Sequence, residues 1–170
     1  MGMRRRARER ALQFLYQNDL NPASNLDEAL EQFFESQRQA AALEAAAAAP
    51  QGSPAAGALS ATPTADDAAV RLFSEPLIKG VLQHKDSVDA EIQKYAHNWD
   101  IRRMAAVDRN ILRLAVYEMR HRQDIPPVVS INEAVEIAKR FSTQDSGKFV
   151  NGILDKVKGD LLRNARVGAS

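Results

Sequence analysis

The sequence has no cysteine, only three histidines and no long apolar run, and each shortage excludes a class of protein. Without cysteine the chain has no disulfide, thiolate metal site or cysteine nucleophile, and we expect a reducing compartment. His84, His97 and His121 are too far apart in the sequence to form a metal-binding pair on one helix. No apolar stretch approaches the roughly 18 residues of a membrane span. These shortages predict a soluble, cytoplasmic protein with no metal and no cofactor.

The sequence signatures of enzymes are also missing. The chain contains no glycine-rich phosphate loop, no nucleophile elbow and no histidine-containing dyad at short range. Most Asp and Glu residues fall at helix positions that we expect to face solvent. Carboxylates that meet only through the fold stay an open alternative without positive support. We therefore expect no catalytic residues.

Charged residues of both signs are plentiful but balanced. The chain carries 23 Lys and Arg against 22 Asp and Glu, which gives a net charge of +1. Attraction to a polyanion therefore depends on local clustering of cations rather than on the total charge. The length of 170 residues is enough for one domain with a sizeable buried core.

Apolar residues recur at helical spacing through nearly every segment, whereas strand-like alternation is missing, so the sequence predicts an all-α fold. The expected helices span residues 4–20, 25–45, 66–82, 86–97, 103–121, 130–142 and 146–163. Asn25 is expected to cap the second helix. Ser130 with Glu133 has the spacing of a capping box for the sixth, and Asp145 or Ser146 is expected to cap the last.

Residues 40–65 form a low-complexity segment in which alanine dominates and Pro and Gly punctuate the second half. Such a segment buries too little apolar surface to offset its ordering entropy. We expect its first part to extend the second helix and about 51–64 to form a mobile loop. This segment separates an N-terminal helix pair from a C-terminal bundle of about five helices. We expect the pair and the bundle to share one core.

The densest group of cations opens the chain in MRRRARER, and its arginines are Arg4, Arg5, Arg6, Arg8 and Arg10. A helix N-terminus already carries partial positive charge, so these cations disfavour the helix that they begin. The apolar stripe of the same helix consists of Ala11, Leu12, Phe14 and Leu15. Arg4 and Arg8 project into the sector of that stripe. We therefore expect the arginine turns to protrude past the core or to line an open groove.

Exposed arginines at a helix start suit RNA, because the guanidinium fork matches phosphate oxygens and stacks on bases. The alternative is a solvated basic tail that pairs with Glu9 or with other acidic neighbours. Composition alone leaves both interpretations open.

The last predicted helix offers a second basic and aromatic feature in DSGKFVNGILDKV. Its buried face is expected to consist of Val150, Ile153, Leu154 and Val157. Phe149 falls at the edge of this face beside Lys148 and Lys156, where it could stack a base while the ammonium groups meet phosphates. Packing of Phe149 on a neighbouring helix is the alternative. We expect Asn151-Gly152 to mark close helix packing.

Two acidic residues of the fifth predicted helix fall inside its apolar sector. These are Asp108 and Glu118, while Arg109, Arg113 and Arg120 line the opposite face. A charge that faces a core is costly unless it is paired. Each carboxylate is therefore expected either to find a basic partner in this chain or to be covered by a second protein.

Three blocks of the sequence, RRRARERALQFLY, VDRNILRLAVYEM and VVSINEAVEIAKRFSTQDSGKFVNGILDKV, resemble the NusB family of bacterial transcription antitermination factors. The resemblance covers about 4–20 and 70–158. It implies an all-helical fold of two packed bundles and no catalysis. In one domain of 1–170, the N-terminal sub-bundle would span about 1–83, with a flexible insert at 46–65, and the C-terminal one about 84–165.

The resemblance also implies partners. Family members bind the boxA element of ribosomal RNA operon leader transcripts together with the ribosomal protein NusE, and the complex joins the RNA polymerase elongation complex with other Nus factors. Carried over to this chain, the RNA-binding residues are Arg4, Arg5, Arg6, Arg8, Arg10, Tyr95, Lys148 and Phe149. Tyr16 and Asp108 resemble positions that face NusE, which would explain a carboxylate at Asp108 within an apolar sector.

Two segments depart from the family pattern, the long insert at about 40–65 and the segment AHNWDIRRM. A helical protein-binding module and an rRNA-targeting domain without an antitermination role stay alternatives, although no catalytic domain follows in this sequence. Monomer and homodimer are both open. If the arginines are exposed, replacing Arg6 and Arg8 with Ala should weaken RNA binding and change stability by no more than about 1 kcal/mol.

Overall fold

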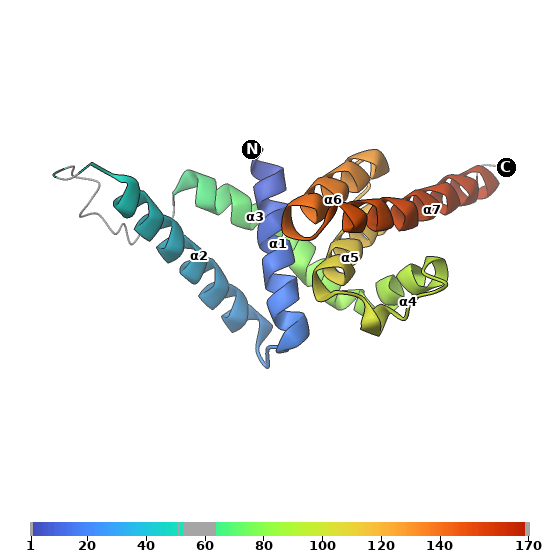
Figure 1. Ribbon diagram of the computed structural model, residues 1–170, viewed down its shortest axis with the longest axis horizontal. Helices are drawn as coiled ribbons and strands as arrows, with labels where there is room; N and C mark the ends of the chain where they lie inside the picture. Colours follow the sequence, from blue (N-terminus) through green and yellow to red (C-terminus); the bar gives the residue numbers. More distant parts are fainter. Residues whose placement is uncertain (1, 51, 53–63, 169–170) are drawn as a thin grey trace.

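The computed structural model describes residues 2–50, 52 and 64–168, and every regular element in them is helical. The helices are α1 (Met3–Leu20), α2 (Leu26–Ala48), α3 (Ala65–Gln83), α4 (Lys85–Tyr95), α5 (Ala106–His121), α6 (Pro127–Phe141) and α7 (Gln144–Gly168), with a short 3-10 turn η2 (Ile101–Arg103) before α5. In Figure 1, α2 reaches to one side and α7 to the other, and α1 and α5 lie between them. The predicted all-α fold is confirmed.

Two clusters of buried apolar side chains hold the helices together. The first lies among α1, α2 and α3 and includes Phe14, Leu30 and Leu77. The second and larger cluster lies among α4, α5, α6 and α7. Leu114 of α5 belongs to the first cluster and Leu12 of α1 to the second, so these two helices join the bundles. The fold of two packed bundles is confirmed, and the division of the chain near residue 83 stays a prediction.

The helix faces follow from the spacing of apolar residues. The predicted stripe of α1 is buried at Ala11, Leu12, Phe14 and Leu15. The predicted face of α7 is buried at Val150, Ile153, Leu154 and Val157. Burial of such stripes is the main stabilising contribution to a helical bundle.

Caps explain where several helices begin. The side chain of Asn25 accepts a hydrogen bond from the Glu28 N–H, as predicted. The predicted capping box at Ser130 is wrong, because α6 begins at Pro127, whose fixed backbone angle suits a first turn. The expected caps of the last helix are also wrong, since Thr143 Oγ1 accepts from the Ser146 N–H at 3.0 Å.

The connection between α4 and α5 differs from the prediction. Helix α4 ends at Tyr95, and η2 occupies the place where a longer fifth helix was expected to begin. The Gln93 side chain holds this loop, because its amide nitrogen donates to the carbonyl oxygens of Ala96 (3.1 Å) and Trp99 (2.7 Å). Its amide oxygen accepts from the Ile101 N–H at 2.8 Å. The Gln93 side chain therefore bonds to three residues of this loop.

Helix α2 extends to Ala48, so the expectation that the alanine run lengthens it is confirmed. Helix α3 begins with a capping box of Thr64 and Asp67. Most of the loop expected at about 51–64 lies outside the described residues. None of the described helices combines the length and apolar character that crossing a membrane requires.

Two glycines of the described helices have opposite surroundings. A Cβ on Gly80 would lie 2.1 Å from the Tyr117 hydroxyl oxygen, so α3 and α5 approach closely there. A Cβ on Gly152 would meet nothing within 4 Å, so the expectation that Asn151-Gly152 marks close packing is wrong. Gly152 lies on the exposed side of α7, and a sequence motif alone does not distinguish these two cases.

Candidate nucleic-acid interface

The first arginine of the predicted arm lies over an aromatic ring. Arg4 is exposed, and its guanidinium carbon is 5.1 Å from the centre of the Phe73 ring. Arg8 and Arg122 approach the same ring at 5.4 Å and 5.5 Å. At these distances a cation is attracted to the ring face. Phe73 of α3 therefore holds the start of α1 in place.

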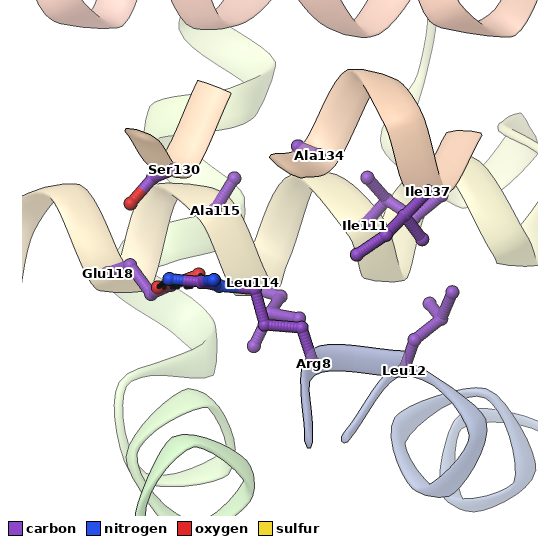
Figure 2. A pocket seen from close by; sticks show the side chains of 9 residues that line it. All are labelled: Arg8, Leu12, Ile111, Leu114, Ala115, Glu118, Ser130, Ala134 and Ile137. Carbon is purple, nitrogen blue, oxygen red and sulfur yellow. Dashed lines mark hydrogen bonds and ion pairs between the residues drawn. The ribbon is translucent and has the colours of Figure 1, made fainter. Parts of the chain in front are cut away.

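Arg8 lies in the core instead of protruding from it. Its side chain forms an ion pair with Glu118 of α5, with Nη2 2.7 Å from Oε1 and Nε 3.0 Å and 3.1 Å from the two carboxylate oxygens. Figure 2 shows Arg8 reaching from α1 to Glu118 beside Leu114 and Ala115. Both partners are at most 3 % exposed. The expectation that the turn of Arg8 protrudes is therefore wrong, and the expectation that Glu118 finds a basic partner is confirmed.

The buried carboxylate explains this position of Arg8. Burial raises the pKa of Glu118, and the hydrogen bonds and charge of Arg8 oppose the shift. An unpaired carboxylate at this depth is strongly destabilising. Arg8 therefore stabilises the contact between α1 and α5.

Arg5 lies on the accessible side of α1. It forms a bidentate ion pair with Glu133 of α6, at 2.7 Å and 3.0 Å, and its side chain is 37 % exposed. The hydrogen bonds from Arg5 lower the pKa of Glu133. One turn further along, Glu9 of α1 accepts from Arg140 of α6 at 2.9 Å. Two ion pairs therefore join α1 to α6, and α1 supplies the arginine in one and the carboxylate in the other.

Arg6 and Arg10 lie on another side of α1, towards α2 and α3. They line a hollow of about 260 Å³ together with Phe34, Arg38 and Asp67. Arg10 donates to the side-chain oxygens of Gln13 and Gln37. The structure therefore divides the five arginines between the Phe73 ring, the core, the surface of α6 and this hollow.

Further cations extend the exposed side of α1 towards α7. Arg140 and Lys139 of α6 have side chains that are 53 % and 44 % exposed. Lys139 packs against Gly147, where an added Cβ would be 3.2 Å from its Cγ. Lys148 follows directly and is exposed. An accessible basic surface thus runs from Arg5 across the end of α6 to the start of α7, and we refer to it as the basic track.

Phe149 lies at the far end of the basic track. Its ring is partly buried against the C-terminal core and lies 6.4 Å from the Trp99 ring, with the ring planes at 70°. Packing of Phe149 on the core and stacking of Phe149 on an RNA base are therefore compatible, because only part of its side chain is buried. Trp99 itself is 56 % exposed.

Tyr95 occupies a more enclosed position. Its ring packs against the C-terminal core, and its hydroxyl oxygen is buried without a hydrogen-bond partner among the described residues. Lys94 Nζ lies 5.4 Å from the centre of the ring. The polar atom of Tyr95 is therefore turned away from solvent.

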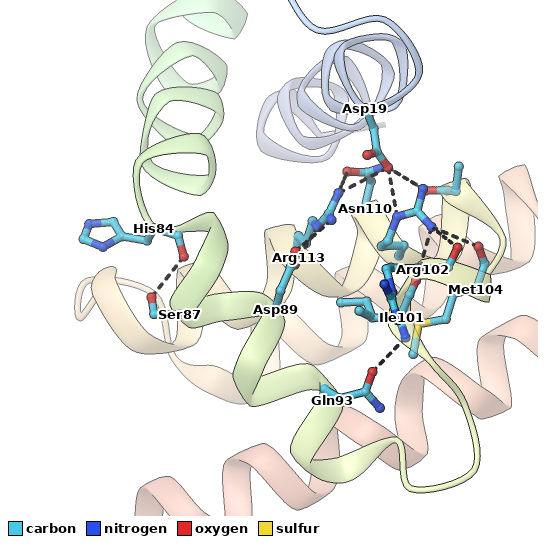
Figure 3. A network of polar contacts seen from close by, with 12 residues as sticks. Asp19, His84, Ser87, Asp89, Gln93, Ile101, Arg102, Met104, Asn110 and Arg113 are labelled. Atoms are coloured by element: carbon cyan, nitrogen blue, oxygen red, sulfur yellow. Dashed lines mark hydrogen bonds and ion pairs between the residues drawn. The ribbon is translucent and has the colours of Figure 1, made fainter.

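A second network holds the opposite end of α1. Asp19 accepts from Arg109 at 2.6 Å and 2.9 Å and from Asn110 at 3.0 Å. Arg113 lies 3.2 Å from Asp19 and also pairs with Asp89 of α4. Figure 3 shows these side chains converging from α1, α4 and α5. Burial alone would raise the pKa of Asp19, but the hydrogen bonds and charges of these partners lower it overall.

The two predicted protein-contact residues lie in different places, Tyr16 beside α2 and Asp108 against the start of α7. Tyr16 is 37 % exposed and lines an open groove of about 770 Å³ between α1 and α2, which also includes Leu20 and Phe33. Asp108 accepts a hydrogen bond from Ser146 Oγ at 3.0 Å through Oδ2. Its Oδ1 is buried and has no partner within the described part of the chain. The alternative of an internal ion pair for Asp108 is therefore wrong.

Comparison with known proteins decides the family. The NusB family profile matches residues 5–158. The transcription antitermination protein NusB of Thermodesulfovibrio yellowstonii is 39 % identical over 169 residues, which cover 95 % of each chain. The chain belongs to the NusB family. Within the described residues of this NusB-family chain, no group of three His, Asp or Glu side chains is placed as a metal site.

Solved structures agree with the NusB fold. T. maritima NusB is 32 % identical, with a TM-score of 0.65 over 91 % of this chain and 89 % of that one. A chain from a crystal structure of the antitermination factors NusB and NusE in complex with dsRNA is 24 % identical, with a TM-score of 0.68 over 92 % and 96 % of the two chains. The second comparison supports the fold alone.

Proposed function

We propose that this NusB-family chain is a transcription antitermination factor that binds boxA-type RNA of ribosomal RNA operon leaders together with NusE. The observation that supports this function most directly is the basic track, which joins the arginine-rich start of α1 to Lys148 and Phe149 of α7. Continuous exposed cations suit a phosphate backbone, and an aromatic ring at their end suits an unpaired base.

The residues predicted to serve RNA binding have different roles in this proposal. Arg4, Arg5 and Lys148 contact phosphates, and Phe149 contacts a base. Arg6 and Arg10 extend the cationic surface on the side of α2 and α3. Arg8 acts indirectly, because its pair with Glu118 holds the first turns of α1 where the neighbouring arginines can reach RNA. Tyr95 packs against the C-terminal core and contacts RNA through the edge of its ring.

NusE binds another part of the surface in this proposal. The groove beside Tyr16 offers apolar side chains. Asp108 Oδ1 is buried in the isolated chain, so in this proposal the Asp108 side chain turns outward to meet a donor of NusE. The assembled complex joins the RNA polymerase elongation complex with other Nus factors. The protein works in the cytoplasm, by binding and without catalysis.

A titration of RNA in the presence and absence of NusE tests the proposal. We expect boxA RNA to bind more tightly than a scrambled RNA of equal length, and NusE to strengthen the preference. Binding should weaken steeply with salt, because each neutralised phosphate releases counterions. Equal affinity for both RNAs with and without NusE would contradict the function, and binding of NusE alone would favour a protein-binding module.

A single substitution tests whether Lys148 contacts an RNA phosphate or only adds to the overall positive charge of the protein. Lys148→Ala removes the ammonium group of an exposed residue, so the fold should be unchanged. We expect the slope of log K against log salt concentration to become shallower by about 0.7, the value for one phosphate of a single strand. Lys85→Ala, at the start of α4, is the control for removal of one lysine. An unchanged slope in Lys148→Ala would remove Lys148 from the RNA contact.

A further inference from the structure

The most exposed aromatic side chain of the described residues has no assigned role. Trp99 is 56 % exposed, whereas Phe14 and Phe33 are at most 6 % exposed in the core. It lies in the α4–α5 loop and reaches the ring of Phe149 from α7. Tryptophan is large and apolar, so leaving it in solvent has no folding benefit. Its position beside a candidate base-contact residue points to a ligand.

The loop that carries Trp99 is fixed before any ligand arrives. The backbone carbonyl of Trp99 accepts from Gln93, and the next residue, Asp100, caps η2 by accepting from the Arg102 N–H at 3.0 Å. Arg109 donates to the carbonyl oxygens of Ile101 and Met104, both at 3.2 Å. A side chain held on such a loop loses little conformational entropy on binding. Trp99 is therefore pre-organised as a contact residue.

The surroundings of Trp99 are polar and carry charges of both signs. Beside it lies an open hollow of about 550 Å³, lined by Gln93, His97, Asn98, Trp99, Asp100, Ile101 and Arg102. This size falls within the range of sites for small ligands or single nucleotides, about 300–1,000 Å³. Arg102 and Lys94 have side chains that are 86 % and 69 % exposed, and they pair with Asp100 at 2.9 Å and with Asp160 at 3.5 Å. A protein-docking surface would more often have an apolar centre that lacks charge.

The ring geometry restricts what can bind. The planes of Trp99 and Phe149 are 70° apart, so the two rings cannot stack on the same base or on two bases that are stacked on each other. Two neighbouring nucleotides must be splayed apart to use both rings. Splayed, unstacked bases are typical of single-stranded RNA in protein complexes and are absent from a regular duplex.

We propose that Trp99 stacks on an unpaired RNA base next to the base at Phe149, and that the hollow beside it receives this nucleotide. The inference rests on the proposed RNA-binding function and extends the basic track from α7 onto the 96–102 loop. The exposed Asn98 amide and His97 ring offer hydrogen bonds to base edges. Arg102 and Lys94 attract the flanking phosphates.

The single tryptophan of the sequence provides a direct test. We expect titration with single-stranded boxA RNA to quench the intrinsic fluorescence of Trp99 in a saturable manner, with the same midpoint as a gel shift. A double-stranded RNA of the same sequence should quench it much less. Saturable binding of single-stranded RNA with unchanged Trp99 emission would overturn the inference and leave the proposed function intact, because binding itself would still be observed.

Substitutions separate stacking from simple apolar contact. Trp99→Ala and Trp99→Leu should each weaken RNA binding by about 5- to 150-fold, because both remove the aromatic face, while Trp99→Phe should retain most of the affinity. The salt slope should stay unchanged in all three variants, in contrast to Lys148→Ala. Leu72→Ala, at a residue of α3 that is 80 % exposed, controls for loss of an exposed apolar side chain.

The outcomes distinguish the inference from the proposed function. Wild-type affinity in Trp99→Ala, or affinity retained in Trp99→Leu, would overturn stacking. Loss of NusE binding with unchanged RNA binding would also overturn it, in favour of a protein contact. Failure of the wild-type chain to bind RNA in any of these assays would instead contradict the proposed function. Thermal unfolding of each variant verifies that the fold is retained.

Discussion

Arg8 shows how one residue can differ from its neighbours of the same type. The sequence predicts that Glu118 needs a partner, because the spacing of residues within a single helix is enough to place this carboxylate on the apolar face. It does not predict that Arg8, 110 residues away, supplies the partner, because such pairing depends on how α1 crosses α5. The remaining arginines of the arm lie at the surface or at its margins. The same residue type thus serves the fold at one position and is available for binding at others.

Removal of Arg8 should destabilise the protein strongly. Arg8→Ala leaves the buried Glu118 carboxylate unpaired, so we expect a loss of about 3–5 kcal/mol in the free energy of unfolding, measured with urea. Arg4→Ala, which removes an exposed cation from the Phe73 ring, should lower it by no more than about 1 kcal/mol. The expectation that Arg6 and Arg8 can be replaced together at little cost therefore fails at Arg8.

A double variant identifies the cause. In Arg8→Met combined with Glu118→Leu, no buried charge is left unpaired, so most of the lost stability should return. Equal stability of Arg8→Ala and the wild type would show that Glu118 finds another partner or water, and the ion pair would then contribute nothing to the fold.

Helices and their faces could largely be predicted, because periodicity is a local property of the sequence. The buried stripes of α1 and α7 lie where apolar spacing puts them. The ends of elements were harder, since Pro127 begins α6 and Gln93 fixes the α4–α5 loop through hydrogen bonds that spacing does not reveal. Trp99 was missed for the same reason. Its type was visible, but its exposure and its neighbour Phe149 depend on the fold.

Two glycine substitutions test helix packing. Gly80→Ala puts a Cβ into the Tyr117 ring, so α3 and α5 must separate or Tyr117 must move, and we expect destabilisation of about 1–3 kcal/mol. Gly152→Ala meets open space in an exposed helix, so it should stabilise the protein by about 0.5–1 kcal/mol. Urea unfolding of both variants provides the comparison. The same sign for both changes would contradict the close approach at Gly80.

At the scale of the whole molecule, the Asp19 network joins the end of α1 to α4 and α5. Its members come from three separate segments of the sequence, so their meeting could not be predicted from spacing. The fold of two packed bundles was predicted through the resemblance. The network explains why the bundles hold together at the end of α1 that lies away from the arginine arm.

This network should make stability depend on acid. The pKa of Asp19 in the folded protein lies below its ordinary value of 3.8. Its stabilising contribution is therefore complete above that value and is lost as the pH falls through the folded-state pKa. Asp19→Asn should be less stable than the wild type at pH 7, and the difference should shrink as the pH approaches 2.

Unfolding with urea from pH 7 to pH 2 measures this dependence. Asp27→Asn is the control, because Asp27 is exposed in the first turn of α2 and pairs with Lys79 at 3.3 Å, and an exposed pair contributes little. A constant difference between Asp19→Asn and the wild type across the pH range would show that Asp19 does not titrate with the predicted sign.

The pairing of Arg5 with Glu133 and of Arg140 with Glu9 has a consequence for selectivity. An arginine that is already paired must leave its carboxylate before it can contact a phosphate. The net free energy gained per contact is therefore the difference between an arginine–phosphate and an arginine–carboxylate interaction, which are similar in strength. Weakly matched polyanions then gain almost nothing from displacing the carboxylates. Only a strand whose phosphates and bases fit several positions at once gains enough to replace them, and the internal carboxylates thereby act as competitors that raise the threshold for binding.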